Sequence, residues 1–187
     1  MAVAGSVREL GCDVLCPLDA RADRPTTIAD AVLLVAAFPP DDRLRALAIA
    51  TRRLALQLLF EIDSSGGDRA IDDVLSRLDE VEDLGPIHRE RVEMLVRGSW
   101  AGRSQADRLF ASLAPTWPAS RQPGVDRALL RLSHFEITSG LTPAKIAVNE
   151  AVELAKRFST ERSPSFINGL LGKLVRSMQD EASAAQQ

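Results

Sequence analysis

Apolar residues recur every three to four positions through most of this chain, which is the spacing of one face of an α-helix. In the segment 43–63, Leu47, Leu54, Leu58 and Ile62 lie on one such stripe. The same spacing predicts further helices over 68–79, 86–97, 104–113, 125–138, 143–158 and 164–178. The sequence contains no run of about four to eight alternating β-branched residues that would indicate a strand. The pattern therefore predicts an all-α fold with six to seven helices.

Turn-forming residues separate these predicted helices. A connector over 115–123, with proline at each end, divides the helices into two halves. Two later helices are preceded by a hydroxyl residue and a proline, Thr142-Pro143 and Ser163-Pro164. A hydroxyl is a good N-cap, and proline at the first helical position loses no hydrogen bond. We therefore expect Thr142 and Ser163 to cap these helices.

The two ends of the chain differ from the middle. In residues 1–42 short apolar patches alternate with Pro, Gly and Asp, so we expect a poorly ordered N-terminal extension. The helical domain then spans 43–180, and 181–187 form a polar, frayed tail. The longest apolar run, 28–38, is about half of the ~20 residues that a membrane span needs. Mixed charges precede it, unlike in a signal peptide, so the sequence predicts a cytoplasmic protein with no membrane partner.

Composition limits the kind of ligand that this domain can bind. Hydrophobic residues make up 45% of the chain and charged residues 26%, which fits a soluble domain with a core. The formal net charge is -3, whereas general polyanion binders carry an excess of positive charge. A nucleic-acid surface on this protein must therefore be local.

Motifs of catalysis and metal binding are missing from the sequence. It has no phosphate-binding glycine loop, no dinucleotide-binding glycine motif and no nucleophile elbow. Cys12 and Cys16 have a C-x3-C spacing, and His88 and His134 do not complete a zinc-ligand pattern around them. We therefore predict a protein that is not an enzyme and that needs no cofactor and no metal.

Four segments carry the strongest functional signal. Residues 126–136 read DRALLRLSHFE, residues 143–156 read PAKIAVNEAVELAK, and residues 166–171 read FINGLL. In order and spacing they resemble the D-R-x-x-L-R-x-x-x-x-E, P-x-x-V-A-I-N-E-A-V-E-L-A-K and F-V-N-G-V-L motifs of the NusB family. Residues 53–60, RLALQLLF, resemble the first helix of that family, R-x-x-A-x-Q-x-L-Y. The resemblance covers about residues 43–179.

This resemblance implies a transcription antitermination factor built from two small helical bundles packed together. Its expected partners are boxA-type RNA of nascent ribosomal RNA transcripts, a small-subunit ribosomal protein that acts as a transcription factor, and the RNA polymerase elongation complex. One alternative is a helical protein-protein interaction module that has lost RNA binding. A NusB-like domain also begins a ribosomal RNA cytosine methyltransferase, but the chain has no room for its catalytic domain, so the free-standing factor is the better match.

The resemblance also assigns the RNA contacts, at the start of the first helix and at the start of the last. The matching residues are Arg52, Arg53, Gln57, Phe60, Arg162, Ser163, Ser165 and Phe166. Arginines attract phosphates, and an exposed ring gives an unstacked base a surface to lie on. The start of the last helix should add free backbone N–H groups that favour an anion. For Phe60, core packing and RNA contact are equally good interpretations.

The segment before the A-x-Q motif departs from the family pattern. The family places a run of basic residues just before the A-x-Q segment, where this chain has AIAT at 48–51. Fewer phosphate contacts weaken binding, so we expect poor RNA affinity without the protein partner. Asn149, Glu150 and Asn168 are interpreted as structural, with Asn168 reaching the neighbouring helix and Gly169 permitting its close approach.

Overall fold

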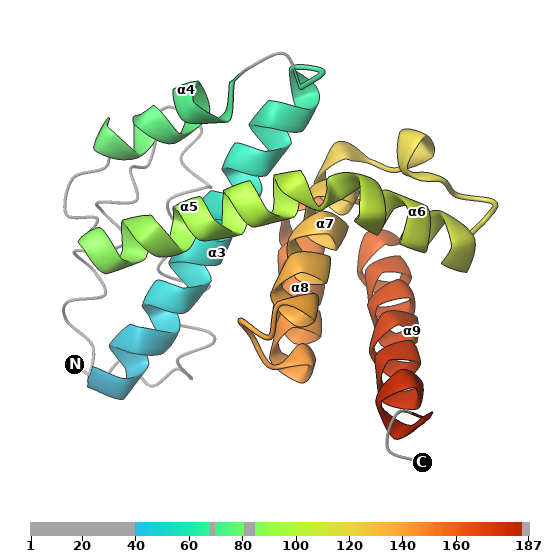
Figure 1. Cartoon of the computed structure of the whole chain (residues 1–187). Helices are drawn as coiled ribbons and strands as arrows, with labels where there is room; N and C mark the ends of the chain where they lie inside the picture. Colours follow the sequence, from blue (N-terminus) through green and yellow to red (C-terminus); the bar gives the residue numbers. More distant parts are fainter. Residues whose placement is uncertain (1–39, 68–69, 81–84, 185–187) are drawn as a thin grey trace.

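The computed structural model describes residues 40–67, 70–80 and 85–184. Most of the predicted N-terminal extension, with Cys12 and Cys16, lies outside these residues. The described part forms seven α-helices and two short 3-10 helices, and it contains no strand (Figure 1). In chain order the elements are α3 (Pro40–Ser64), α4 (Ile71–Leu75), η1 (Ser76–Glu80), α5 (Pro86–Ala101), α6 (Arg103–Leu113), η2 (Ala119–Arg121), α7 (Gly124–Thr138), α8 (Ala144–Phe158) and α9 (Ser163–Ala184).

The helices form two groups on either side of one core. In the first group α3 packs along α5, with α4 beside them, and in the second α8 packs between α7 and α9. The two groups meet because α7 also packs against α3 and α5. Buried side chains of both groups belong to a single cluster that includes Leu59, Leu95, Leu129 and Leu171. The predicted all-α fold is confirmed.

Gly98 allows a close approach between the two groups. A Cβ atom at Gly98, in the last turn of α5, would lie 2.0 Å from the ring of Phe135 on α7. Only glycine leaves room for the aromatic ring at this crossing. Gly102 then separates α5 from α6, which continues in nearly the same direction (Figure 1).

A network of charged side chains joins α3, α6 and α7. Arg131 Nη1 donates to Asp63 at 2.7 Å, and its Nε and Nη2 donate to Asp107 at 2.9 and 2.7 Å. Arg127 Nε donates to Asp63 as well, at 2.8 Å. Burial alone would raise the pKa of the Asp63 carboxyl, but the hydrogen bonds from Arg127 and Arg131 hold this pKa below its usual range. The two arginines of the D-R-x-x-L-R motif are therefore structural.

Several predicted helix boundaries differ from the structure. The first helix begins at Pro40 rather than at 43, and the helix predicted over 68–79 is divided into α4 and η1. The last helix continues six residues beyond Met178, to Ala184, so 181–184 of the predicted tail are helical. The residues of this extension include no glycine or proline, which are the residues that disfavour a helix most, so the helix continues through them.

The predicted cap at Thr142 is wrong. Pro143 is the N-cap of α8, and no side chain caps this helix. The Thr142 hydroxyl is buried and donates instead to the Glu136 carboxylate at 2.7 Å. A buried carboxylate gains more from a charge-assisted hydrogen bond than the helix end gains from a neutral one, which is the physical reason for the difference.

The structural interpretation of Asn168 is also wrong. Its side chain is exposed, and a Cβ atom at Gly169 would meet nothing within 4 Å. The apolar face of α9 is formed by Ile167, Leu171 and their neighbours along the helix, and Asn168 lies outside it. Glu150, by contrast, is half-buried and lies 3.7 Å from an arginine on α3, as a structural residue would.

Candidate RNA interface

One face of α3 carries three of the predicted RNA-binding residues. Arg53, Gln57 and Phe60 are spaced four and three residues apart, which places them on one side of the helix. Gln57 and Phe60 are exposed, and Phe60 is 41% accessible to solvent. A Cβ atom at Gly124, the first residue of α7, would lie 2.9 Å from this ring. Phe60 therefore packs against the start of α7 and stays partly exposed to solvent, and RNA contact by this ring stays a prediction.

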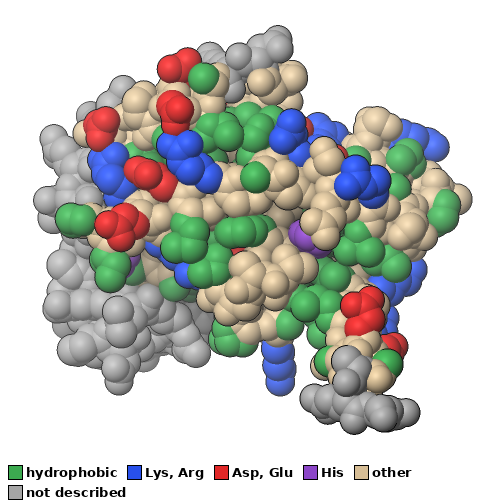
Figure 2. All heavy atoms as spheres, viewed as in Figure 1, with side chains coloured by type: hydrophobic (Ala, Val, Ile, Leu, Met, Phe, Trp, Pro, Cys, Tyr) green, Lys and Arg blue, Asp and Glu red, His purple; other side chains and the backbone are tan. Residues whose placement is uncertain are grey.

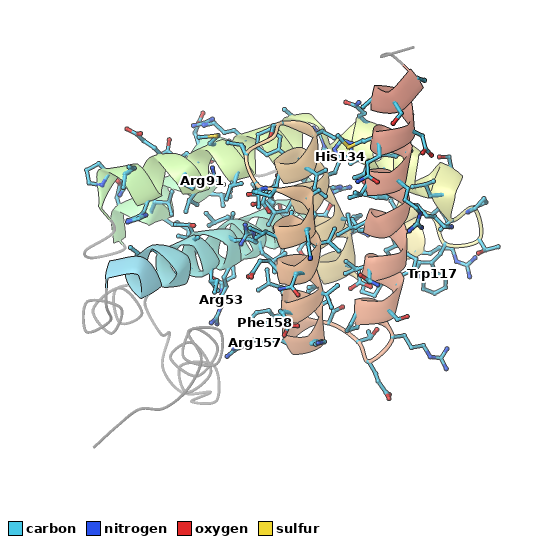
Figure 3. All side chains as sticks on the ribbon, turned by 90° about the horizontal axis from the view of Figure 1, so that it is seen from below. Arg53, Arg91, Trp117, His134, Arg157 and Phe158 are labelled. Carbon is cyan, nitrogen blue, oxygen red and sulfur yellow. The ribbon has the colours of Figure 1, made fainter. Side chains whose placement is uncertain are left out.

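Arg53 extends this face toward the end of α8. Its side chain is 8% exposed, and its guanidinium lies 4.9 Å from the centre of the Phe158 ring. Arg157 approaches the same ring at 5.4 Å. Figure 3 shows the three side chains together below the core. Phe158 and Arg157 were not predicted, because a helix-terminal Lys-Arg-Phe sequence is also typical of an ordinary C-terminal turn.

A buried carboxylate fixes the start of α9 next to the start of α7. Asp126 is 2% exposed and accepts hydrogen bonds from the hydroxyls of Ser159 and Ser163, the latter at 2.7 Å. The Ser163 hydroxyl also accepts from the Thr160 N–H at 3.2 Å. Ser163 is thus buried in the turn between α8 and α9. It positions Phe166, three residues further on, rather than facing outward itself.

The anion site predicted from the free N–H groups at the start of α9 is wrong. The N–H of Ser163 donates to the Thr160 carbonyl, and the N–H of Phe166 donates to the Arg162 carbonyl. Pro164 has no N–H to offer. The carboxylate of Asp126 adds a negative charge beneath this turn. Positive charge at this end of the molecule comes from the exposed side chain of Arg162, with Ser165 exposed beside it.

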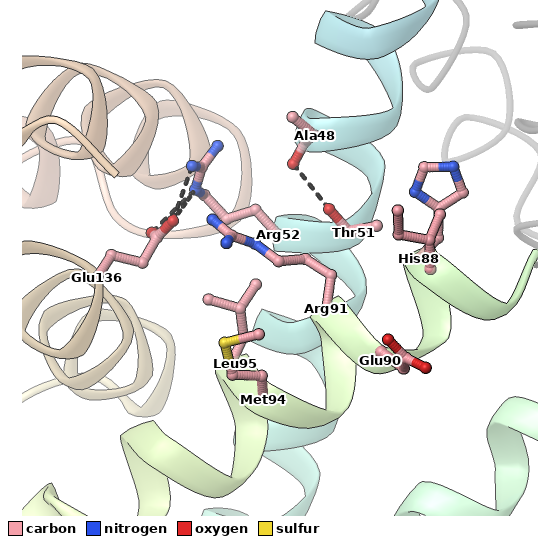
Figure 4. A pocket seen from close by; sticks show the side chains of 10 residues that line it. Ala48, Thr51, Arg52, His88, Glu90, Arg91, Met94, Leu95 and Glu136 are labelled. Atoms are coloured by element: carbon pink, nitrogen blue, oxygen red, sulfur yellow. Dashed lines mark hydrogen bonds and ion pairs between the residues drawn. The ribbon is translucent and has the colours of Figure 1, made fainter. Parts of the chain in front are cut away.

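Arg52 lies on a different side of α3 from Arg53. Its Nε and Nη2 donate to the Glu136 carboxylate at 2.9 and 2.8 Å (Figure 4). Its Nη1 lies 3.7 Å from Glu150. Arg52 is 6% exposed and Glu136 is fully buried. Burial alone would lower the pKa of Arg52, but the hydrogen bonds and charge of Glu136 raise it above its usual value. RNA contact by Arg52 stays a prediction, and in this structure its guanidinium joins α3 to α7 and α8.

A cavity of about 690 Å³ lies beside the start of α9. Phe166 and Arg162 from the start of α9 line it, together with Trp117 of the connector. Trp117 is 40% exposed, and the guanidinium of Arg121 lies 5.2 Å from its ring. Sequence reasoning missed Trp117 as a functional candidate because the connector has no periodicity. The only available signal was a large aromatic residue between prolines.

Charge on another face of the molecule is mixed. Figure 2 shows acidic and basic side chains interspersed over α4 and α5. Arg97 pairs with Asp72 there, and Arg89 pairs with Asp79 at 2.8 Å. Of the described residues, no three His, Cys, Asp or Glu side chains gather in a way that could hold a metal ion. Within that part of the chain, no helix is long and apolar enough to cross a membrane.

Fold and surface together define an all-α protein of two packed helical groups. The partly exposed rings of Phe60 and Phe166 and the exposed side chain of Arg162 lie beside the start of α7. The model of the NusB family matches residues 49–176. The chain is 43% identical over 136 residues to the transcription antitermination protein NusB of Chloroflexus aggregans, covering 71% of this chain and 89% of that protein. It is 45% identical over 141 residues to the same-named protein of Symbiobacterium thermophilum, covering 71% and 92%. The chain belongs to the NusB family.

Solved structures agree with this assignment. T. maritima NusB superposes with a TM-score of 0.62 at 27% identity, covering 68% of this chain and 89% of that one. The solution structure of NusB from Aquifex aeolicus gives a TM-score of 0.60 at 19% identity, covering 72% and 91%, and this likeness concerns the fold alone. The curated relatives are named for a role in transcription and not for a catalysed reaction.

Proposed function

We propose that this protein is a cytoplasmic transcription antitermination factor that binds boxA-type RNA of nascent ribosomal RNA transcripts together with a small-subunit ribosomal protein. Through these partners it joins the RNA polymerase elongation complex. The name of the curated relatives supports the antitermination role. The observation that carries the RNA role is the position of two accessible rings, Phe60 and Phe166, which both lie beside the start of α7.

The proposed RNA surface consists of Arg53, Gln57, Phe60, Arg162, Ser165 and Phe166, with Arg157 added from the structure. The rings offer unstacked bases a flat apolar surface, and the arginines neutralise phosphates between them. Gln57 and Ser165 are exposed and supply hydrogen bonds to base edges or sugars. We assign Arg52 and Ser163 to the support of this surface, because Arg52 donates to the Glu136 carboxylate and Ser163 to the Asp126 carboxylate.

Substitution of the two rings tests the RNA role. Loss of one base-aromatic stack costs about 1–3 kcal/mol, so Phe60→Ala and Phe166→Ala should each weaken RNA binding roughly 5- to 150-fold. Fluorescence anisotropy with a labelled boxA-type RNA, in the presence of the ribosomal protein, measures this change. Met94→Ala is the matched control, because Met94 is 43% exposed on α5, away from the proposed surface. Equal affinity of both Phe variants and the control would contradict the proposal.

The salt dependence of the same titration tests the predicted weakness of binding by the protein alone. Arg53, Arg157 and Arg162 are the cations of the proposed surface. Each phosphate neutralised in a single strand contributes about 0.7 to the slope of log K against log salt, so three contacts give a slope near −2. Such a slope is shallow, and we expect tight binding only with the ribosomal protein present. Tight binding of the RNA by this chain alone at physiological salt would show that other cations take part.

A second candidate is a protein-binding module that has lost RNA recognition. The commitment of Arg52 to Glu136 and the apolar AIAT segment at 48–51 favour it, because both reduce the positive charge available on α3. A pull-down separates the two functions. Retention of the ribosomal protein without any retention of RNA, unchanged by Phe60→Ala or Phe166→Ala, would favour the module.

A further inference from the structure

The cavity between the connector and the start of α9 has features that the proposed RNA surface does not use. It measures about 690 Å³ and is broadly open to solvent. This volume lies within the range of roughly 300–1,000 Å³ that small-molecule sites occupy. It therefore has room for one nucleotide.

Two aromatic rings line this cavity from different elements. Trp117 comes from the connector and is 40% exposed, and Phe166 comes from the first turn of α9 and is half-buried. An exposed tryptophan presents a large apolar surface to water. An unstacked base can cover this surface by stacking, without base-specific hydrogen bonds. Figure 3 shows Trp117 on the opposite side of α9 from Arg53 and Phe158. The cavity therefore extends the proposed surface to a second side of this helix.

The wall that carries Trp117 is held in place by several hydrogen bonds. The backbone N–H of Trp117 donates to the Ala114 carbonyl at 2.9 Å, and the buried side-chain amide of Gln122 donates to the Trp117 backbone carbonyl at 3.1 Å. Lys173 of α9 reaches across and donates to the Leu113 carbonyl at 2.9 Å. The ring is thus presented by a fixed segment, and a fixed platform loses little conformational entropy when a ligand binds.

The charges around the cavity favour an anionic occupant. Arg162 and Lys173 line it, and Arg121 lies over the Trp117 ring. Asp126 is the one acid among the lining residues, and both of its oxygens already accept a hydroxyl hydrogen bond. The chain as a whole has a net charge of -3. The three cations around the two rings therefore make the charge of this region more positive than that of the chain as a whole. Aromatic platforms combined with cations fit a nucleotide, in which a flat base is joined to a phosphate.

We propose that this cavity is a nucleobase pocket that receives one unstacked base of the bound RNA on Trp117, with Arg121 and Arg162 facing the adjoining phosphate. The proposal rests on the proposed RNA-binding function. Phe166 belongs to both the proposed RNA surface and the cavity wall, so a single strand that crosses the surface reaches the pocket directly. The base is read by stacking, so the pocket accepts any base and adds affinity more than sequence preference.

Three variants at Trp117 test the pocket. Trp117→Ala should weaken binding of a labelled boxA-type RNA, in the presence of the ribosomal protein, by roughly 5- to 150-fold. Trp117→Phe retains a ring and should keep most of the affinity, whereas Trp117→Leu retains bulk without a flat π-face and should resemble alanine. Ile87→Ala is the control, because Ile87 is 71% exposed on α5, outside the cavity. Thermal melts of all variants show whether the fold is unchanged.

A series of RNAs, each lacking one base, identifies the base in the pocket. With the unaltered protein, one abasic position beyond those sensed by Phe60 should lower affinity, and with Trp117→Ala the same position should lower it no further. Equal affinity of Trp117→Ala and the control, or an unchanged abasic profile, would overturn the pocket while leaving the RNA-binding function in place. Loss of ribosomal-protein binding by Trp117→Ala in the absence of RNA would instead make the cavity a protein-docking site and overturn the proposal. Failure of the unaltered protein to retain RNA would remove the proposed function, and the pocket with it.

Discussion

Replacement of Arg52 by methionine would leave the carboxylate of Glu136 buried without its main counter-charge. Glu136 has no exposed surface and receives three Arg52 hydrogen bonds, from Nε at 3.2 and 2.9 Å and from Nη2 at 2.8 Å. Only the Thr142 hydroxyl, at 2.7 Å, continues to donate to it among the contacts given by the structure. Removal of one partner from a buried ion pair costs about 3–5 kcal/mol, because the remaining charge loses its compensation.

This cost can be measured as a change in the free energy of unfolding. For a chain of this size each kcal/mol lowers the melting temperature by about 2–4 °C, so Arg52→Met should lower it by roughly 6–20 °C. Circular dichroism during heating and urea titration gives both quantities. Arg97→Met is the matched control, because Arg97 pairs with Asp72 on the surface, where ion pairs contribute about 0–1 kcal/mol.

The double variant Arg52→Met, Glu136→Met tests the cause of the destabilisation. An apolar pair of similar volume removes the uncompensated charge and should recover much of the lost stability. The outcome that would refute this reasoning is an Arg52→Met protein as stable as the Arg97→Met control. If such a protein had also lost RNA affinity, Arg52 would be an RNA contact, as the sequence predicts, and its bonds to Glu136 would contribute nothing to the fold.

Two further predictions concern the core. Gly98→Ala would place a methyl group 2.0 Å from the Phe135 ring, and overpacking of this kind costs about 1–3 kcal/mol, which the same urea titration would detect; unchanged stability would mean that α5 and α7 separate easily. His134 is buried and packs against Phe110 in an edge-to-face arrangement, with the two ring centres 6.1 Å apart. This burial lowers the pKa of His134 below its ordinary value of 6.5. Below about pH 6.5 the unfolded chain therefore binds a proton at this histidine that the folded protein does not bind. The free energy of unfolding should decrease as the pH is lowered from about 6.5 to the lowered pKa. Melting temperatures between pH 7.5 and 5.5 should show a smaller fall for His134→Gln, and equal slopes for both proteins would exclude His134 as the cause.

Local periodicity predicted the helices well, because it depends on the same stripes that the core uses. The stripe of Leu54, Leu58 and Ile62 is buried as expected. Asn168 could have been placed correctly by the same rule, since its neighbours Ile167 and Leu171 already occupy the inward face of α9. The interpretation instead placed Asn168 at the seam between two helices, where a polar side chain needs a hydrogen-bond partner, whereas the exposed side chain needs none.

Partners that lie far apart in the sequence could not be predicted from it. Arg52 and Arg53 are adjacent and chemically identical, yet one bonds to Glu136, 84 residues away, and the other stacks on Phe158. A turn of about 100° between neighbouring helical positions separates their surroundings, and only the packing of α7 and α8 shows which is which. Trp117 lies in a segment without regular structure, where no spacing rule applies.

The packing of α3 against α7 has a consequence for the protein while it is being made. Synthesis proceeds from the N-terminus, so α3, α4 and α5 leave the ribosome before α7 exists. Leu59, Leu95 and their neighbours belong to a core that α7 completes, and Arg52 lacks its carboxylate until Glu136 emerges. Until then α3, α4 and α5 have apolar surface exposed, and the nascent chain acquires its native fold only when α7, α8 and α9 follow.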